Sequence, residues 1–271
     1  MKTLLVLGFC LLFANQLYGQ INCEVYKNSG DLKKYEACKI AEERAGHYQF
    51  SFEYQDALDR ALAVDSTFSW AYRYKSTAYL KSGDFITWKK LMDQAVSLDP
   101  AAHLDYRGWC RFQFFRDYKG AIEDIERLKS LVNYDIGSSQ NGYYHLEIAR
   151  ALCYKGLGQS EKAIEIIEEK LQDTDYSPGP YIYLHLGVLY LEKGDLDAAI
   201  ETLQKQEKIN DLAENNYYLA LAYAKKGDQK ASSESLKKAK EKYTTGMKMF
   251  DPYVVQMDKI YLRDLDALVA N

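Results

Sequence analysis

The chain has 271 residues, of which 47% are hydrophobic and 27% are charged, and its formal net charge is −4. Acidic and basic residues are interspersed, so the sequence contains no basic stretch that would indicate a nucleic-acid-binding protein. After the first residues, no apolar run approaches the length that a bilayer crossing requires.

Residues 1–19 have the pattern of a secretory signal peptide. Lys2 gives a short positive start, residues 4–13 form an apolar run, and Gly19 is a small residue at the predicted cut. The apolar run of about ten residues is too short to span a membrane. We therefore expect cleavage after Gly19, export to the periplasm or the medium, and an N-terminal segment at residues 20–34.

A lipoprotein anchored through Cys23 is the competing interpretation of this region. Lipidation signals have small residues directly before the modified cysteine. Here the preceding residues 20–22 read Gln-Ile-Asn. This mismatch disfavours lipidation of Cys23 but leaves it as an alternative.

Four cysteines remain after the leader: Cys23, Cys38, Cys110 and Cys153. An exported compartment permits disulfides, and Cys23 and Cys38 flank a polar turn, so they are candidates for a bridge whose formation the spacing alone does not decide. Cys110 and Cys153 fall at equivalent positions of neighbouring helices, about 10 Å apart. That distance exceeds the roughly 7 Å a disulfide spans, so both are predicted to be buried and free.

The stretch from Tyr181 to Tyr243 contains one pattern twice. The first copy reads YIYLHLGVLYLEKGDLDAAIETLQKQEKI, and the second reads NNYYLALAYAKKGDQKASSESLKKAKEKY. Gly194 of the first copy lies 33 residues before Gly227 of the second. A period of about 34 residues, with a glycine turn between two helical segments, predicts stacked helix–turn–helix units.

This pattern resembles the tetratricopeptide repeat, which has a small residue at its eighth position, an aromatic at its eleventh, Gly at the turn and Ala at its twentieth. The two copies supply Gly187, Tyr190, Gly194 and Ala199, and then Ala220, Tyr223 and Gly227, with Ser232 where the family has Ala. The resemblance implies an all-α, right-handed solenoid, in which the small residues let the helices of a unit approach closely.

About six units are expected in an array over residues 35–246, at 35–68, 69–102, 103–131, 143–175, 180–212 and 213–246. Residues 132–142 are rich in Gly, Ser and Asn and are predicted to be a loop. Such a loop inside an array is either functional or a tolerated insertion. An amphipathic stripe predicts a C-terminal capping helix in residues 247–271 that covers the last unit.

The resemblance also implies which side chains line the concave wall of the solenoid. In the first helix of each unit the eighth and eleventh positions are used for packing, so the second, fifth and ninth positions face inward. On this chain those positions include Trp70, Arg73, Trp109, His145, Tyr181, Leu184 and Tyr217. Because aromatic side chains and arginine are the usual anchors of protein interfaces, this wall is predicted to bind a protein or peptide partner, with Trp109 and Tyr217 as anchors.

No arrangement of residues in the sequence indicates catalysis. The four histidines fall one to a unit, without the paired spacing of a zinc site, and no Gly-x-Ser-x-Gly nucleophile motif occurs. We therefore expect no catalytic residue, no metal and no cofactor. An enzyme that uses the edge formed by His103, His145 and His185 is the remote alternative.

The sequence as a whole indicates a non-catalytic scaffold or adaptor of the cell envelope that binds a protein or peptide along its concave surface. The alternative from another functional class is a structural component that self-associates in an envelope complex and has no free-peptide ligand.

Overall fold

The computed structural model describes residues 21–268. The predicted leader, residues 1–19, and the C-terminal residues 269–271 lie outside the described residues. Within 21–268 the regular structure is helical, and the only β pairing is an isolated bridge between Ser138 and His145. The structure therefore confirms the predicted all-α class.

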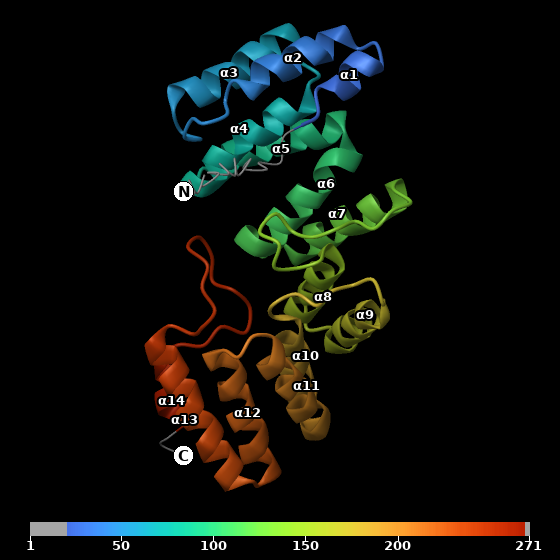
Figure 1. Cartoon of the computed structure of the whole chain (residues 1–271). Helices are drawn as coiled ribbons and strands as arrows, with labels where there is room; N and C mark the ends of the chain where they lie inside the picture. The colour runs from blue at the N-terminus through green and yellow to red at the C-terminus, as the bar shows by residue number, and fades with distance from the viewer. Residues whose placement is uncertain (1–20, 269–271) are drawn as a thin grey trace, which may run out of the picture. The chain divides into compact units, whose positions relative to one another are not determined.

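Helices follow one another in antiparallel pairs along the chain (Figure 1). In order they are α1 (Glu24–Asn28), α2 (Leu32–Glu42), α3 (Phe52–Val64), α4 (Ser69–Ser82), α5 (Phe85–Leu98), α6 (Pro100–Cys110), the π-helix η1 (Arg111–Phe115), α7 (Tyr118–Leu131), α8 (Leu146–Gly156), α9 (Ser160–Gln172), α10 (Ile182–Lys193), α11 (Leu196–Ile209), α12 (Ala213–Lys226), α13 (Gln229–Thr245) and α14 (Leu262–Ala267). The chain divides after Leu91, within α5, into two compact units. We call them unit 1 and unit 2.

Unit 1 is organised around the packing of α2 on α3 and of α3 on α4. Its core contains Ala37, Leu58, Phe68 and Ala71, all of which are buried. The helix faces that carry these residues are apolar at helical spacing, and burying them is the main favourable term in the stability of the unit.

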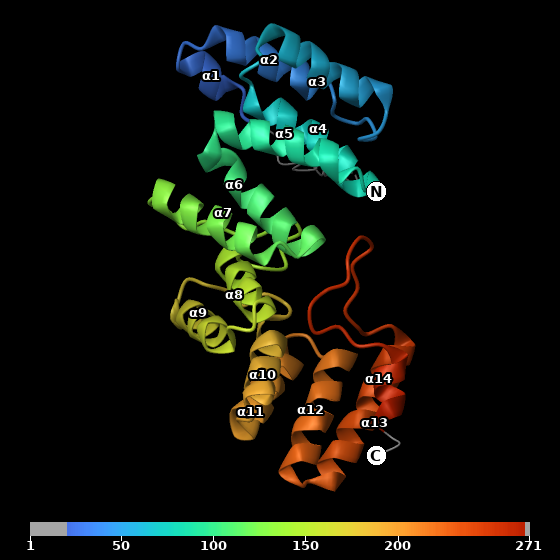
Figure 2. The ribbon, with the colours of Figure 1, turned by 180° about the vertical axis from the view of Figure 1, so that it is seen from behind.

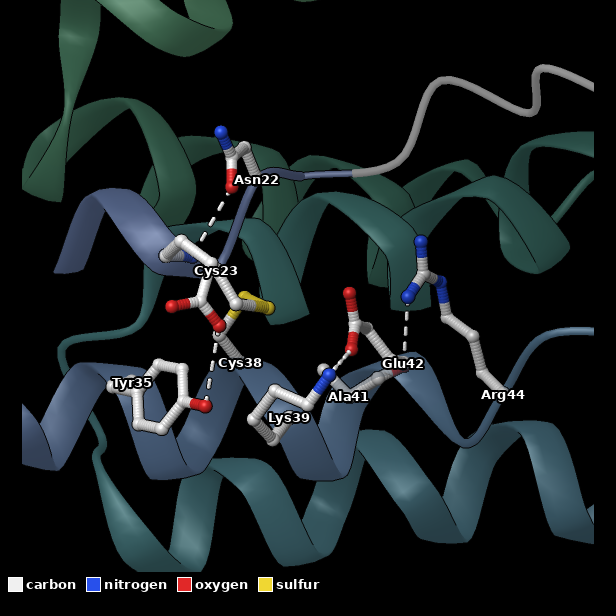
Figure 3. Close-up of a disulfide and its surroundings, with 9 residues drawn as sticks. Asn22, Cys23, Tyr35, Cys38, Lys39, Ala41, Glu42 and Arg44 are labelled. Carbon is white, nitrogen blue, oxygen red and sulfur yellow. Dashed lines mark hydrogen bonds and ion pairs between the residues drawn. A yellow bond between two sulfur atoms is a disulfide. The ribbon is translucent and has the colours of Figure 1, made fainter. Parts of the chain in front are cut away.

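A disulfide closes the N-terminal end of unit 1 (Figure 3). Cys23, at the start of α1, is bonded to Cys38 in α2, and their Cα atoms are 5.6 Å apart. Beside the bridge, the Tyr35 hydroxyl donates a hydrogen bond of 3.3 Å to the Glu24 carboxylate. The other two cysteines of the described chain, Cys110 and Cys153, are buried and form no disulfide.

Unit 2 contains four complete helix pairs: α6 with α7, α8 with α9, α10 with α11, and α12 with α13. The first helices of these pairs also contact one another in sequence, α6 with α8, α8 with α10 and α10 with α12. They make a continuous surface, which we call the first-helix face of unit 2. Figure 2 shows the same pairs from behind.

A two-residue turn joins the helices of the α10–α11 pair. Gly194 has a φ of 88°, a left-handed conformation that glycine adopts without strain, and it ends α10. Asp195 then caps α11, since its carboxylate accepts a hydrogen bond of 3.2 Å from the Ala198 N–H. The sequence pattern Gly-Asp therefore contains both the stop signal of one helix and the start signal of the next.

The turn between α6 and α7 lacks a glycine and has a different geometry. The end of α6 continues into η1, whose wider hydrogen-bonding pattern accommodates an extra residue. Arg116 then adopts the left-handed conformation, with a φ of 52°. The Arg111 guanidinium steadies this turn, because it donates a hydrogen bond of 2.9 Å to the Gly120 carbonyl.

The predicted C-terminal capping helix over 247–271 is wrong for most of its length. The described chain is helical there only at α14, and residues 247–261, which we call the strap, have no regular secondary structure. Pro252 disfavours helical backbone at Asp251, and Asp258 has a φ of 61°. The amphipathic stripe is correspondingly divided, with Ile260 buried and Tyr253 exposed.

Gly187 provides a test of the packing within the α10–α11 pair. A Cβ atom at this position would lie 2.6 Å from Leu203 Cγ and 2.8 Å from Leu203 Cδ2. We predict that Gly187→Ala lowers the free energy of unfolding by about 1–3 kcal/mol through overpacking, measured by urea denaturation. Leu203→Ala removes the clashing atoms, so the double variant should cost less than the sum of the two single variants. Additive costs would show that the two positions do not meet.

Candidate functional site

In unit 1, two of the predicted wall residues, Trp70 and Arg73, lie together on α4. Both side chains are half-buried, and the Arg73 guanidinium lies 5.0 Å from the centre of the Trp70 ring. Tyr74 continues the cluster, since its ring centre is 5.9 Å from that of Trp70 and 3.6 Å from the Arg44 guanidinium. This arrangement combines neighbouring aromatic rings with two cations on a partly accessible surface.

Trp109 does not have the groove position that the sequence predicted. Its side chain is only 7% exposed, and it packs between Tyr106, at 6.0 Å, and Phe114, at 5.6 Å between ring centres. The α-helix changes into a π-helix at Arg111, two residues after Trp109, which alters the direction of the following side chains. Trp109 therefore belongs to the core of unit 2.

His145 lies at the start of α8 and acts as its N-cap, instead of facing the wall as predicted. Its Nδ1 atom accepts a hydrogen bond of 3.1 Å from the Glu147 N–H. Its Nε2 atom lies 2.8 Å from the Asp135 carboxylate in the loop 132–142. Burial alone would raise the pKa of Asp135, but hydrogen bonds from His145 and Lys170 hold it well below its usual range.

A pocket of about 290 Å³ adjoins this loop. Its lining mixes both charges with apolar side chains and includes Lys129, Tyr134, Asp135, Ile136, His145, Glu147 and Lys170. Lys129 is paired with Glu147, and Lys170 is paired with Asp135. The first pair joins α7 to α8, and the second fixes the loop 132–142 to α9, so a structural role accounts for these charged residues.

Tyr181 and Leu184, at the start of α10, are buried, so neither is available as an open anchor. Helix α10 is mostly apolar: Tyr183 and Tyr190 are half-exposed, and only Glu192 and Lys193 at its end are exposed. A helix of this kind needs a cover over most of its surface. Helices α8, α9, α11 and α12 pack against α10, and the strap reaches it at His185.

The strap leaves the end of α13 and returns to α14, as Figures 1 and 2 show. Its first part is bound to the start of α12. The Ala213 N–H donates to the Met247 carbonyl at 2.8 Å, and the Met249 N–H donates to the Glu214 carboxylate at 3.0 Å. Burial raises the pKa of Glu214, although the backbone N–H of Met249 acts in the opposite direction. Tyr217, the last predicted wall residue, is half-buried on α12 and packs against Tyr218 at 5.2 Å.

Asp258 anchors the second part of the strap. One carboxylate oxygen lies 2.6 Å from the Lys155 ammonium on α8, and the other lies 2.6 Å from His185 Nδ1 on α10. The side chain is only 7% exposed. Burial alone would raise the pKa of Asp258, but the charges and hydrogen bonds of Lys155 and His185 hold it below its usual range.

His185 connects Asp258 to a third residue, Tyr144. A carboxylate only accepts hydrogen bonds, so His185 Nδ1 carries a hydrogen, and Nε2 is hydrogen-bonded to the Tyr144 hydroxyl at 3.1 Å. Carboxylate, imidazole and hydroxyl stand in the order that activates a nucleophile in many hydrolases. The Tyr144 hydroxyl, however, is buried, and burial raises its pKa well above the usual value. The network therefore orients the strap, and it does not present a nucleophile to a substrate.

The sequence analysis identified neither Asp258 nor Lys155 as a site residue. Asp258 is 103 residues from Lys155 and 73 residues from His185 along the chain. No local pattern marks such pairs. The one available signal was the strongly apolar character of α10, which requires a cover that the repeat pattern does not provide.

Two general findings complete the description of residues 21–268. No group of three or more His, Cys, Asp or Glu side chains there is placed to hold a metal ion. None of the helices there combines the length and the apolar character needed to cross a membrane.

The Asp258 contacts predict a dependence of stability on pH. Asp258→Asn removes the buried charge and leaves Lys155 with the exposed Glu192, 3.5 Å away, as its remaining acidic partner. Loss of one member of a buried pair costs about 3–5 kcal/mol, and here the cost is limited by the free energy with which the strap closes. Because the pKa of Asp258 is lower in the folded than in the unfolded chain, its contribution is complete above the unfolded value of about 4 and is lost as pH falls through the folded value.

Urea denaturation at neutral and acidic pH should therefore show a difference between wild type and Asp258→Asn that narrows below about pH 4. The exposed Asp266 is a matched control, and Asp266→Asn should change little. A wild type–variant difference that stays constant on acidification would contradict the assigned role of the Asp258 carboxylate.

Comparison with known proteins agrees with the helix pairs. A family model of the tetratricopeptide repeat matches residues 180–211. The TPR repeat-containing protein MJ1428 of Methanocaldococcus jannaschii is 26% identical over 147 residues, which are 51% of this chain. The chain spans only 24% of the length of that relative.

Two solved structures are similar over most of the chain. PilW, a widely conserved type IV pilus biogenesis factor, has a TM-score of 0.61 and 14% identity over 89% of this chain and 98% of its own. PilF of Pseudomonas aeruginosa has a TM-score of 0.55 and 13% identity over 82% of this chain and 89% of its own. At such low identity the similarity establishes the fold, a solenoid of helix pairs.

Proposed function

We propose that this chain, whose residues 180–211 match the tetratricopeptide repeat and whose fold is similar to that of PilW, is a non-catalytic scaffold that binds a protein or peptide partner on the first helices of its pairs. Solenoids of stacked repeats form extended concave surfaces, which these proteins use to bind partners. The proposal concerns the class of function, and it names the surface on which the partner is expected.

The observation that carries the proposal is the cluster of Trp70, Arg73 and Tyr74 on α4. Tryptophan, tyrosine and arginine are the residues that most often dominate binding energies at protein interfaces. Here they lie side by side, half-buried, and held by the contacts with one another and with Arg44. A preorganised aromatic and cationic surface loses little side-chain entropy when a partner docks.

Self-association into a structural assembly is the second candidate, and a different surface favours it. Tyr48, in the connection between α2 and α3, is 72% exposed, and Phe52, at the start of α3, is 78% exposed. The Tyr48 ring also contacts Phe50, at 5.6 Å between ring centres. Clustered exposed aromatic side chains are unusual on a monomer and mark contact sites.

The two candidates are separated by matched alanine substitutions. We predict that Trp70→Ala and Arg73→Ala each weaken binding of a partner captured by the wild-type chain by about 2 kcal/mol, as interface anchors do. Phe52→Ala, an aromatic truncation of similar size, should leave binding unchanged. Isothermal titration measures the affinity, and thermal unfolding verifies that each variant is folded.

The opposite result supports the second candidate. If Phe52→Ala lowers the molecular mass seen by light scattering, while folded Trp70→Ala and Arg73→Ala retain every partner, the chain works by self-association and the α4 surface is idle.

We also propose that the protein is exported through residues 1–19 and acts in the periplasm or outside the cell. The leader pattern supports this, and so does the bridge between Cys23 and Cys38, since disulfides persist in oxidising compartments. The same bridge disfavours a lipoprotein, because a Cys23 sulfur bonded to Cys38 is not available to carry a lipid.

N-terminal sequencing of protein from its native host should therefore begin at or near Gln20. Mass spectrometry without reductant should find the peptides of Cys23 and Cys38 linked, with Cys110 and Cys153 as free thiols for comparison. A chain that retains Met1, or a lipid on Cys23, would refute this proposal.

A further inference from the structure

The strap lies on the first-helix face of unit 2 in the way that a bound peptide would. It is an irregular segment, residues 247–261, that contacts α8, α10 and α12, the first helices of three successive pairs. We infer that the strap is a displaceable occupant of this face, and that the face takes in its place an extended peptide of another protein with an aspartate or glutamate at the Asp258 position. This inference rests on the proposed binding function and specifies its ligand.

The contacts of Asp258 define the chemistry of that ligand. Lys155 supplies an ammonium and His185 an imidazole N–H, each 2.6 Å from a different carboxylate oxygen. The two groups come from different helices and converge on one carboxylate, which is how proteins recognise an acidic side chain with charge-assisted hydrogen bonds. A peptide without an acid there would leave the Lys155 ammonium, only 8% exposed under the strap, with the exposed Glu192 at 3.5 Å as its remaining acidic partner.

One polar side chain of the strap is poorly satisfied. Gln256 is buried, and neither its Nε2 nor its Oε1 atom makes a hydrogen bond of normal geometry, although the side chain interacts with the Tyr181 hydroxyl. A buried amide without well-formed hydrogen bonds destabilises the closed arrangement, and a ligand with better matched donors and acceptors would avoid this cost.

The strap fully buries apolar side chains only near its two ends. Met249 and Ile260 are buried, whereas Phe250, Tyr253 and Val255 between them are exposed. The middle of the strap is therefore held mainly by the Asp258 contacts, and hydrophobic burial plays a smaller part there. A segment with few buried apolar contacts opens locally at a lower free energy than the helix pairs beneath it.

Charge removal and rescue test the inference on the full-length chain. The probe is a fluorescent synthetic peptide of residues 247–261. In the wild type the tethered strap competes with the probe, whereas in Asp258→Asn the strap is released and the probe restores the missing carboxylate. In the wild type the closed strap lowers the apparent affinity of the chain for the probe. We expect this affinity, measured by fluorescence anisotropy, to rise about tenfold or more when the strap opens.

Two controls define the chemistry. The same peptide carrying Asp258→Asn should not bind the Asp258→Asn chain, and Asp266→Asn in the chain should leave the weak wild-type binding unchanged. Equal binding of both peptides, or no binding to a folded Asp258→Asn chain, overturns the inference. A dimer of the Asp258→Asn chain held by exchanged straps, detected by light scattering, also overturns it, because the occupant would then be a second copy.

Hydrogen exchange on the wild type tests the same point without any substitution. The Met249 amide, which is bonded to Glu214, should exchange much faster than amides in the middle of α12, such as that of Leu219. Equal rates would show that the strap opens only when unit 2 unfolds, which makes it a permanent cap. None of these experiments uses a partner bound at Trp70 and Arg73, so their failure leaves the proposed scaffold function intact.

Discussion

The short turn within each helix pair is the constraint on which the remaining structure depends. At Gly194-Asp195 a left-handed glycine ends one helix and an aspartate caps the next, so the second helix folds back directly on the first. The same two residue types do this at Gly227-Asp228. Because the turn is so short, the paired helices lie close together, and a glycine at position 187 is needed where α11 passes α10.

Repetition of this pair places the first helices next to one another and creates a surface that must be either covered or used. In unit 2 the side chains of α10 are too apolar to remain in water, and the strap provides part of their cover. It does so with a buried aspartate, which is favourable only because Lys155 and His185 satisfy its charge and its hydrogen bonds. An apolar surface thus contains one strongly polar point of attachment.

Such an attachment differs physically from the packing of the helix pairs. Contacts between helices bury many apolar side chains together and are lost only when the pairs unfold. The strap is held by the Asp258 carboxylate, by hydrogen bonds to the start of α12, and by the buried side chains of Met249 and Ile260 near its ends. A competing acid would replace its central attachment. In unit 1, by contrast, the cluster of Trp70, Arg73 and Tyr74 on α4 is partly accessible as the structure stands.

Local signals in the sequence determined the class of fold. The glycine–aspartate turns, the small residues at helix crossings and the period of about 34 residues are all interactions within one or two units, and the structure confirms the all-α fold of paired helices. The candidate site was less predictable. Helical spacing gives the side of a helix on which a residue lies, but not what packs against that side, so Trp109, Tyr181 and Leu184 were placed in an open groove although they are buried.

The tertiary structure alone decided how the C-terminal segment is used. The spacing of its apolar stripe is compatible with a helix. The prediction failed because local propensity contains no information about partners 73 and 103 residues away. Those partners, His185 and Lys155, bind Asp258 with a geometry that exists only after α8 and α10 have packed. Long-range pairing of a buried charge has no local signature in a sequence, and here it converts a predicted capping helix into a strap across the first-helix face.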